Sequence, residues 1–187
     1  MINKMKKNTI NLLSGTILVF SIVLSGACKK VEDTDLKVGG CYDTDSPLHN
    51  ESADYEDGTC QYAYIDSYEL TSHPAANNGQ NWDVFAVGNF TRPDVVLTVT
   101  NQLTGEVLFQ SPETGDIAPS LSPSWSAPYQ VQLFNHNYEW TLYDMDVGGS
   151  DFMAYGVFNP IELANNGTII STSENETTAV TLYYTLK

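Results

Sequence analysis

The sequence predicts an all-β protein, in which an eight-stranded antiparallel β-sandwich follows a small cysteine-bracketed module. From Ala63 onward, segments rich in β-branched and aromatic residues recur between turn signals, as in sandwiches. No amphipathic helix of ten residues is apparent. Cys41 and Cys60 enclose a short segment rich in turn-forming and acidic residues. Together these observations favour a sandwich with a separate N-terminal module.

Residues 1–27 have the features of a secretory signal peptide. Three lysines fall within the first seven residues, and the run 10–24 is apolar. The residues before Cys28 resemble a bacterial lipobox, which implies lipidation of Cys28 and, with Lys29 next to it, anchoring at the outer membrane or cell surface. Ordinary cleavage after Ala27 is the alternative. An uncleaved anchor is disfavoured because the apolar run is short for a membrane span.

Residues 28–39 are charged and lack aromatic side chains and periodicity, so we expect a lipidated tether. If Cys28 carries lipid, Cys41 and Cys60 remain, and an exported setting favours their pairing. In the chain-entropy model such a link contributes about 3 kcal/mol. Two free thiols are the alternative.

Residues 40–62 are therefore predicted to form a disulfide-stapled acidic module. Its first residues, Gly-Cys-Tyr-Asp, and its last, Glu-Asp-Gly-Thr-Cys-Gln-Tyr, resemble a short cysteine-bracketed repeat of secreted bacterial proteins. The resemblance implies a non-catalytic accessory beside a larger domain. Asp43, Asp45 and Asp57 either hold a second cation or are solvated carboxylates around the staple.

Residues 63–187 form the predicted sandwich domain. Leu103 to Glu106 suit a hairpin turn, and the prolines between 112 and 128 predict a loop or an edge. The expected strands are Ala63–Thr71, Asp94–Asn101, Val107–Ser111, Gln130–Asn135, Tyr138–Asp144, Phe152–Phe158, Thr168–Ser173 and Thr178–Leu186.

The charge of the chain disfavours two kinds of partner. The net charge is −15, and Arg92 is the only lysine or arginine between Cys41 and Leu186. Nucleic-acid binding is therefore disfavoured, and so is docking on anionic lipid through a basic face. Acidity suits cation binding, and it also keeps exported proteins soluble.

Two groups of aspartates suggest a calcium site. Asp144, Asp146 and Asp151 surround a Gly-Gly-Ser turn between two expected strands, and like charges this close repel one another unless a hard cation is bound. Asp83 and Asp94 precede another strand. Loops at one end of a sandwich converge, so these five carboxylates could share Ca²⁺. The alternative is a solvated, empty acidic turn.

The order of these features resembles a C2 domain, an eight-stranded sandwich that holds calcium between its loops. Asp83 and Asp94 match the aspartate pair of the first loop, and Pro123-Ser124-Trp125 matches a corner in the middle of the domain. Residues 140–146 match the strand that enters the third loop, and residues 150–153 match its exit. The resemblance implies calcium ligation by Asp83, Asp94, Asp144, Asp146 and Asp151.

Catalysis is not expected. No metalloprotease or serine-hydrolase motif is present, and the three histidines, His49, His73 and His136, are isolated. The predicted function is that of a non-catalytic, calcium-binding surface lipoprotein that binds a surface protein, a glycan or a membrane. The alternative is a glycan-binding or adhesion sandwich in which calcium is structural or absent. Trp82, Trp125 and Tyr129 are candidates for a sugar-binding platform.

Overall fold

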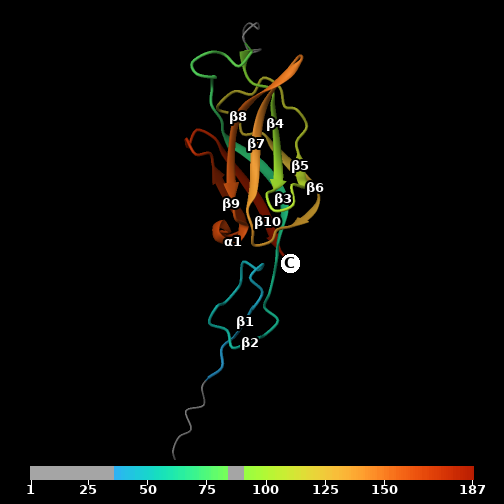
Figure 1. Cartoon of the computed structure of the whole chain (residues 1–187), viewed down its shortest axis with the longest axis vertical. Coiled ribbons are helices and arrows are strands. Elements are labelled where there is room, and N and C mark those ends of the chain that lie inside the picture. Colours follow the sequence, from blue (N-terminus) through green and yellow to red (C-terminus); the bar gives the residue numbers. More distant parts are fainter. Residues whose placement is uncertain (1–35, 84–90) are drawn as a thin grey trace, which may run out of the picture. The chain divides into compact units, whose positions relative to one another are not determined.

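A computed structural model describes residues 36–83 and 91–187 of the chain (Figure 1). The predicted signal peptide, Cys28 and most of the tether lie outside the described residues. Residues Leu36–Lys187 form one compact unit. Within the described part, no helix combines the length and apolarity needed to cross a membrane.

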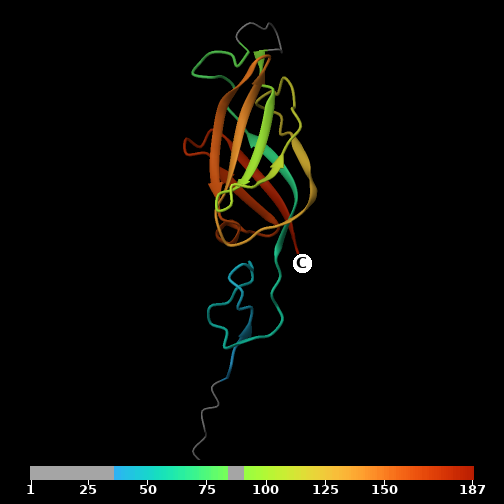
Figure 2. The ribbon, with the colours of Figure 1, turned by 45° about the vertical axis from the view of Figure 1, so that its right-hand side comes forward.

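The sandwich consists of two four-stranded antiparallel sheets, in the orders β6-β3-β10-β9 and β5-β4-β7-β8 (Figures 1 and 2). The prediction of an eight-stranded antiparallel β-sandwich is confirmed. Its strands are β3 (Ala63–Ser72), β4 (Val95–Asn101), β5 (Val107–Gln110), β6 (Ser124–Gln132), β7 (Tyr138–Asp146), β8 (Gly149–Phe158), β9 (Thr168–Thr172) and β10 (Ala179–Leu186).

The core lies between the sheets and follows the two-residue period of the strands. On β7, Tyr138, Trp140 and Leu142 are almost fully buried, while the residues between them are partly exposed. The Trp140 indole Nε1 donates to the Ser171 hydroxyl of the opposite sheet at 2.8 Å. The inward-facing series of β7 therefore holds the sheets together.

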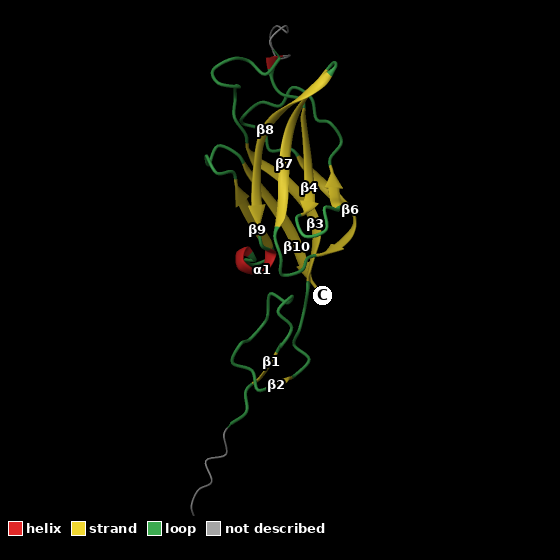
Figure 3. Ribbon diagram, in the orientation of Figure 1, coloured by secondary structure: helices red, strands yellow, loops and turns green. Residues whose placement is uncertain are grey.

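Three strands differ from their predicted bounds by two residues or more. β6 begins at Ser124, six residues before the predicted start, because an edge strand tolerates Pro128, which has no N–H to donate to the ladder. β7 continues to Asp146 and β8 already begins at Gly149, so a tight turn stands where the sequence suggested a wider loop. A short helix, α1 (Pro160–Leu163), follows β8 (Figure 3).

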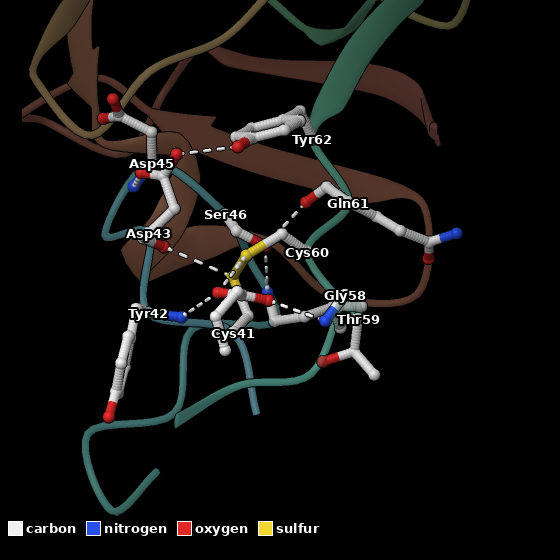
Figure 4. The surroundings of a disulfide bond; sticks show 12 residues. Cys41, Tyr42, Asp43, Asp45, Ser46, Gly58, Thr59, Cys60, Gln61 and Tyr62 are labelled. Carbon is white, nitrogen blue, oxygen red and sulfur yellow. Dashed lines mark hydrogen bonds between the residues drawn. A yellow bond between two sulfur atoms is a disulfide. The ribbon is translucent and has the colours of Figure 1, made fainter. Parts of the chain in front are cut away.

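The N-terminal module has one parallel pair, β1 (Gly39–Gly40) with β2 (Tyr55–Glu56). The predicted disulfide is confirmed, since Cys41 and Cys60 are bonded (Figure 4). Backbone and side-chain hydrogen bonds surround it, including one from the Ser46 hydroxyl to the Gln61 carbonyl at 2.6 Å.

Candidate metal centre

Strand β7 carries two aspartates at its end, and their spacing decides where they point. Asp144 follows Tyr138, Trp140 and Leu142 in the inward-facing series, and Asp146 is the next residue of the same parity. The Asp144 side chain is fully buried, whereas Asp146 at the strand end is exposed. A core-facing position is thus occupied by a carboxylate at one end of the sandwich.

Asp83 completes a cluster of three with these residues. One carboxylate oxygen from each of Asp83, Asp144 and Asp146 lies within 4.8 Å of the others. Asp83 follows Trp82, whose indole is buried and donates to the Pro74 carbonyl at 3.1 Å. That hydrogen bond anchors the segment carrying Asp83, which lies far from β7 in sequence.

The two oxygens of Asp144 have different surroundings. Oδ1 accepts a hydrogen bond from the Asp94 backbone N–H at 2.7 Å. Oδ2 is buried and has no hydrogen-bond partner among the described residues. A buried carboxylate oxygen without a donor is costly, so it points to a ligand or a proton at this place.

The pKa values of Asp144 and Asp83 also show that ionised carboxylates are unfavourable here. Burial raises the pKa of Asp144 from 3.8 to about 6, and the neighbouring Asp83 and Asp146 charges add to the rise, against the Asp94 hydrogen bond that lowers it. Burial is also the main cause that raises the pKa of Asp83 to about 6. A hydrogen bond with Asp146 and repulsion from the Asp146 charge raise it as well. A carboxyl–carboxyl hydrogen bond needs a proton on one partner, and a bound cation could replace that proton.

Asp94 lies beside the cluster and is held in place by its backbone. Its carbonyl accepts from the Met145 N–H at 2.8 Å, and its carboxylate Oδ1 accepts from the Asp116 N–H at 2.6 Å. Both Asp94 and Asp116 contribute to the raised pKa of Asp83 by charge repulsion. Asp94 is therefore near the cluster, although it is not one of its three members.

Asp116 is an acidic neighbour that the sequence reasoning missed. It lies in the loop between β5 and β6, where a bridge between Val95 and Thr114 and a hydrogen bond from the Ile117 N–H to the Pro93 carbonyl fasten the loop beside β4. The sequence offered one signal, a Gly115-Asp116 turn in the proline-containing segment between two strands. It gave no indication that this loop reaches the same end.

Asp151, the fifth predicted ligand, is not part of the cluster of three. It is exposed on β8, in register with Asp144. The strands extend almost to the turn at Val147 and Gly148, so Asp151 occupies a strand position and not the wide loop that the sequence suggested. The structure thus gathers Asp83, Asp144 and Asp146, adds Asp94 and Asp116 nearby, and leaves Asp151 outside.

The carboxylates of the N-terminal module have internal partners. Asp43 accepts from the Tyr62 hydroxyl at 2.7 Å and from the Asp45 N–H at 2.9 Å, and these bonds lower its pKa. Asp57 accepts from the Thr59 N–H at 3.0 Å. Their arrangement favours turn-stabilising acceptors over a second cation site. Cys41, Glu56 and Cys60 also lie together, but the two sulfurs are bonded to each other.

The predicted aromatic platform does not form as a unit. Trp82 and Trp125 are buried, at 5% and 9% exposure, and the Trp125 Nε1 donates to the Thr114 hydroxyl at 3.3 Å. Tyr129 alone of the three is exposed, at 57%. The tryptophans serve packing and loop anchoring.

Comparisons with known proteins give remote structural likenesses. No protein-family model matches the chain, and no curated protein matches its sequence. A solved C2 domain matches with a TM-score of 0.43 and 14% identity, covering 68% of this chain and 98% of that one. A human GIVD cytosolic phospholipase A2 matches with a TM-score of 0.45 and 14% identity, covering 68% of this chain and 17% of that one. A calcium-bound pair of C2 domains from extended-synaptotagmin 2 matches with a TM-score of 0.38 and 17% identity, covering 66% of this chain and 44% of that one. The chain thus spans less than half of the latter two. The fold is assigned from the strand order of the two sheets, and these remote matches are not used to assign it.

Proposed function

We propose that this chain is a non-catalytic calcium-binding surface lipoprotein that uses bound calcium to engage a surface partner or a membrane. The observation that carries the calcium proposal is the buried Oδ2 of Asp144, which lies beside Asp83 and Asp146 and has no hydrogen-bond partner in the part of the chain that the structure describes. Calcium prefers oxygen ligands and tolerates irregular coordination, which suits carboxylates from separate segments. The donor set therefore fits the ion.

Asp83, Asp144 and Asp146 would hold the ion, and the negative charges of Asp94 and Asp116, which already act on Asp83, would help to neutralise its charge. Bound calcium supplies positive charge at a place where burial and repulsion now disfavour ionised carboxylates. The described residues themselves supply rigidity. The Asp94 backbone links β4 to Asp144, and the Trp82 indole holds the segment of Asp83.

The contact surface would lie at the β7–β8 hairpin. Val147 at its tip is completely exposed, and Asp146 directly precedes it. Calcium at the cluster would cancel local negative charge and let this apolar tip approach an acidic protein, an acidic glycan or an anionic lipid head group. No basic face is invoked, because Arg92 is the only lysine or arginine between Cys41 and Leu186.

Calorimetric titration of the chain from Lys29 onward tests the calcium proposal. We expect a calcium Kd in the submicromolar to millimolar range of calcium sensors and extracellular modules, roughly 10⁻⁷ to 10⁻³ M. Asp144→Asn combined with Asp146→Asn should abolish it, and Asp151→Asn serves as a matched control that should retain it. Absence of binding at millimolar calcium would refute the site.

Anchoring is proposed from the sequence and is tested separately. Metabolic labelling with a fatty-acid analogue should mark the wild-type chain at Cys28 and leave Cys28→Ser unlabelled. A chain that is released to the medium without label would contradict the lipoprotein assignment and leave the calcium site untouched.

A further inference from the structure

The open side of the sandwich, between the edge strands β5 and β6, holds a second feature that is independent of the aspartates. A cavity of about 270 Å³ lies there, and its lining includes Leu108, Tyr129, Gln130, Gln132 and Phe134. Its volume is just below the range of about 300–1,000 Å³ for small-molecule sites, so it suits a ligand portion of one or two rings.

A bulge in β6 contributes residues to the lining of this cavity. Ser67 pairs with Ser126 and Ile65 pairs with Val131, so four residues of β6, 127–130, face the single Asp66 of β3. The bulged residues leave the ladder and carry Tyr129 toward β5, where its hydroxyl donates to the Leu108 carbonyl at 3.3 Å. Bulges often re-aim a side chain beside a binding site.

Two aromatic side chains offer exposed surface at the cavity. Tyr129 is 57% exposed although its hydroxyl is anchored, so the ring is held while it remains accessible. Phe134 is 40% exposed, and it is stacked on His136, which in turn stacks on Tyr138 at 4.7 Å. Large apolar rings held open to solvent beside a cavity are suited to stacking with a flat apolar ligand face.

The polar groups of the cavity are mainly uncharged amides. The Gln132 side-chain oxygen accepts from the Tyr64 hydroxyl at 3.1 Å, which leaves its amide nitrogen as a donor. Among the described residues, the Gln130 and Glu106 side chains have no hydrogen-bond partner, so they can bind a ligand without breaking a bond. Amides supply donors and acceptors together, which matches hydroxyl groups.

The charge of the residues that line the cavity narrows the class of ligand further. No lysine or arginine lines the cavity, so a phosphate or carboxylate ligand would find no counter-charge. A cationic ligand would meet one carboxylate, that of Glu106, but it would leave the amide donors unused. An extended peptide is also a poor fit, because the bulge and Pro128 interrupt the edge that it would pair with.

We propose that the cavity between β5 and β6 binds a neutral carbohydrate, with a sugar ring stacked on Tyr129 and its hydroxyls bonded to Gln130, Gln132 and Glu106. The site is separate from the aspartate cluster and goes beyond the proposed calcium function. Asn101 and Tyr138, which also line the cavity, pair at one end of β4 and β7, whereas Val95 and Asp144 pair at the other.

The test is an array of neutral oligosaccharides ending in glucose, galactose, mannose or N-acetylglucosamine, probed with the full-length chain in a non-glycosidic detergent. The strongest glycan is then titrated against variants, with calcium and with chelator. Tyr129→Ala should raise Kd about tenfold or more, because it removes the stacking ring. Tyr129→Phe keeps the ring and should stay within about threefold of wild type.

Tyr183→Ala is the matched control, since Tyr183 is also a partly exposed tyrosine with a bonded hydroxyl, on β10. It should bind like wild type, and chelator should not change the Kd. The proposal is overturned if no neutral glycan binds, if only acidic or cationic ligands bind, or if Tyr129→Ala binds as tightly as wild type. Binding that needs calcium and is lost in Asp144→Asn, but not in Tyr129→Ala, would overturn this cavity and leave the calcium site standing.

Discussion

Replacing Asp144 by asparagine is expected to change stability in opposite directions with and without calcium. The side chain is fully buried, and its Oδ2 has no hydrogen-bond partner within residues 36–83 and 91–187. Asparagine preserves the shape and the oxygen that accepts the Asp94 N–H, while it removes the charge. The variant therefore separates the cost of burying a carboxylate from the benefit of ligating a cation.

The magnitude follows from the raised pKa. A folded-state pKa of about 6 against 3.8 means that ionised Asp144 costs the folded state about 3 kcal/mol at pH 7 relative to the protonated acid. Asparagine resembles the neutral acid, so in chelator the variant should be about 1–3 kcal/mol more stable. In a domain of this size that raises Tm by roughly 3–10 °C.

Calcium should make the wild type more stable than Asp144→Asn, which reverses their order in chelator. A wild-type chain that binds calcium gains about 2.7 kcal/mol at a calcium concentration 100 times its Kd. Asp144→Asn loses a charged ligand and should gain little. Thermal melting of both proteins at pH 7, in chelator and in millimolar calcium, gives the four values needed, and Asp151→Asn, which changes an exposed aspartate outside the cluster, is the control.

Two results would refute the reasoning. If Asp144→Asn melts below wild type in chelator, the buried charge is not the burden inferred from the structure. If the variant keeps the full calcium-induced rise in Tm, Asp144 is not a ligand.

Three further predictions concern pH, packing and the disulfide. In chelator, stability should fall as pH rises from about 4 to 7, because the raised pKa values of Asp83 and Asp144 let the folded state bind more protons than the unfolded state in this window; melting with calcium should show the opposite slope. Gly156→Ala should cost about 1–3 kcal/mol in denaturant unfolding, since its Cβ would lie 2.5 Å from the Trp140 ring, whereas Gly149→Ala, at a glycine that has open space and no positive φ, should be nearly neutral. Cys41→Ser should remove about 3 kcal/mol of loop constraint and expose residues 40–62 to limited proteolysis; unchanged protease resistance would contradict this.

Strand periodicity made most of the sandwich predictable. Alternating residues such as those of β4 and β7 set both the strands and their buried faces, and the structure follows them. The start of β6 could not be inferred this way, because Pro123 and Pro128 look like loop residues until the strand is known to lie at an edge. Edge position is a property of the whole sheet and has no local signal.

The candidate site was predictable in its chemistry and less so in its membership. The spacing of Asp144 and Asp146 identified an acidic stretch. Asp144 also lies two and four residues after the buried Leu142 and Trp140 on the same strand, and this spacing indicates that Asp144 is buried. The inclusion of Asp116 depends on a loop fastened to β4 across the sandwich end. Such long-range backbone contacts cannot be inferred from the local sequence.

The aspartate cluster and the β5–β6 cavity lie at opposite ends of the paired strands β4 and β7, and this separation determines how far they can influence each other. Along β4 the pairs Val95–Asp144 and Asn101–Tyr138 are six residues apart, which corresponds to roughly 20 Å of strand. That distance exceeds the Debye length of about 8 Å at physiological salt, so calcium charge at one end should be screened at the other. Sites this far apart without shared partners usually act additively. Asp144→Asn and Tyr129→Ala should therefore combine without coupling, and a measured dependence of sugar affinity on calcium would require a rearrangement of β4 or β7 themselves.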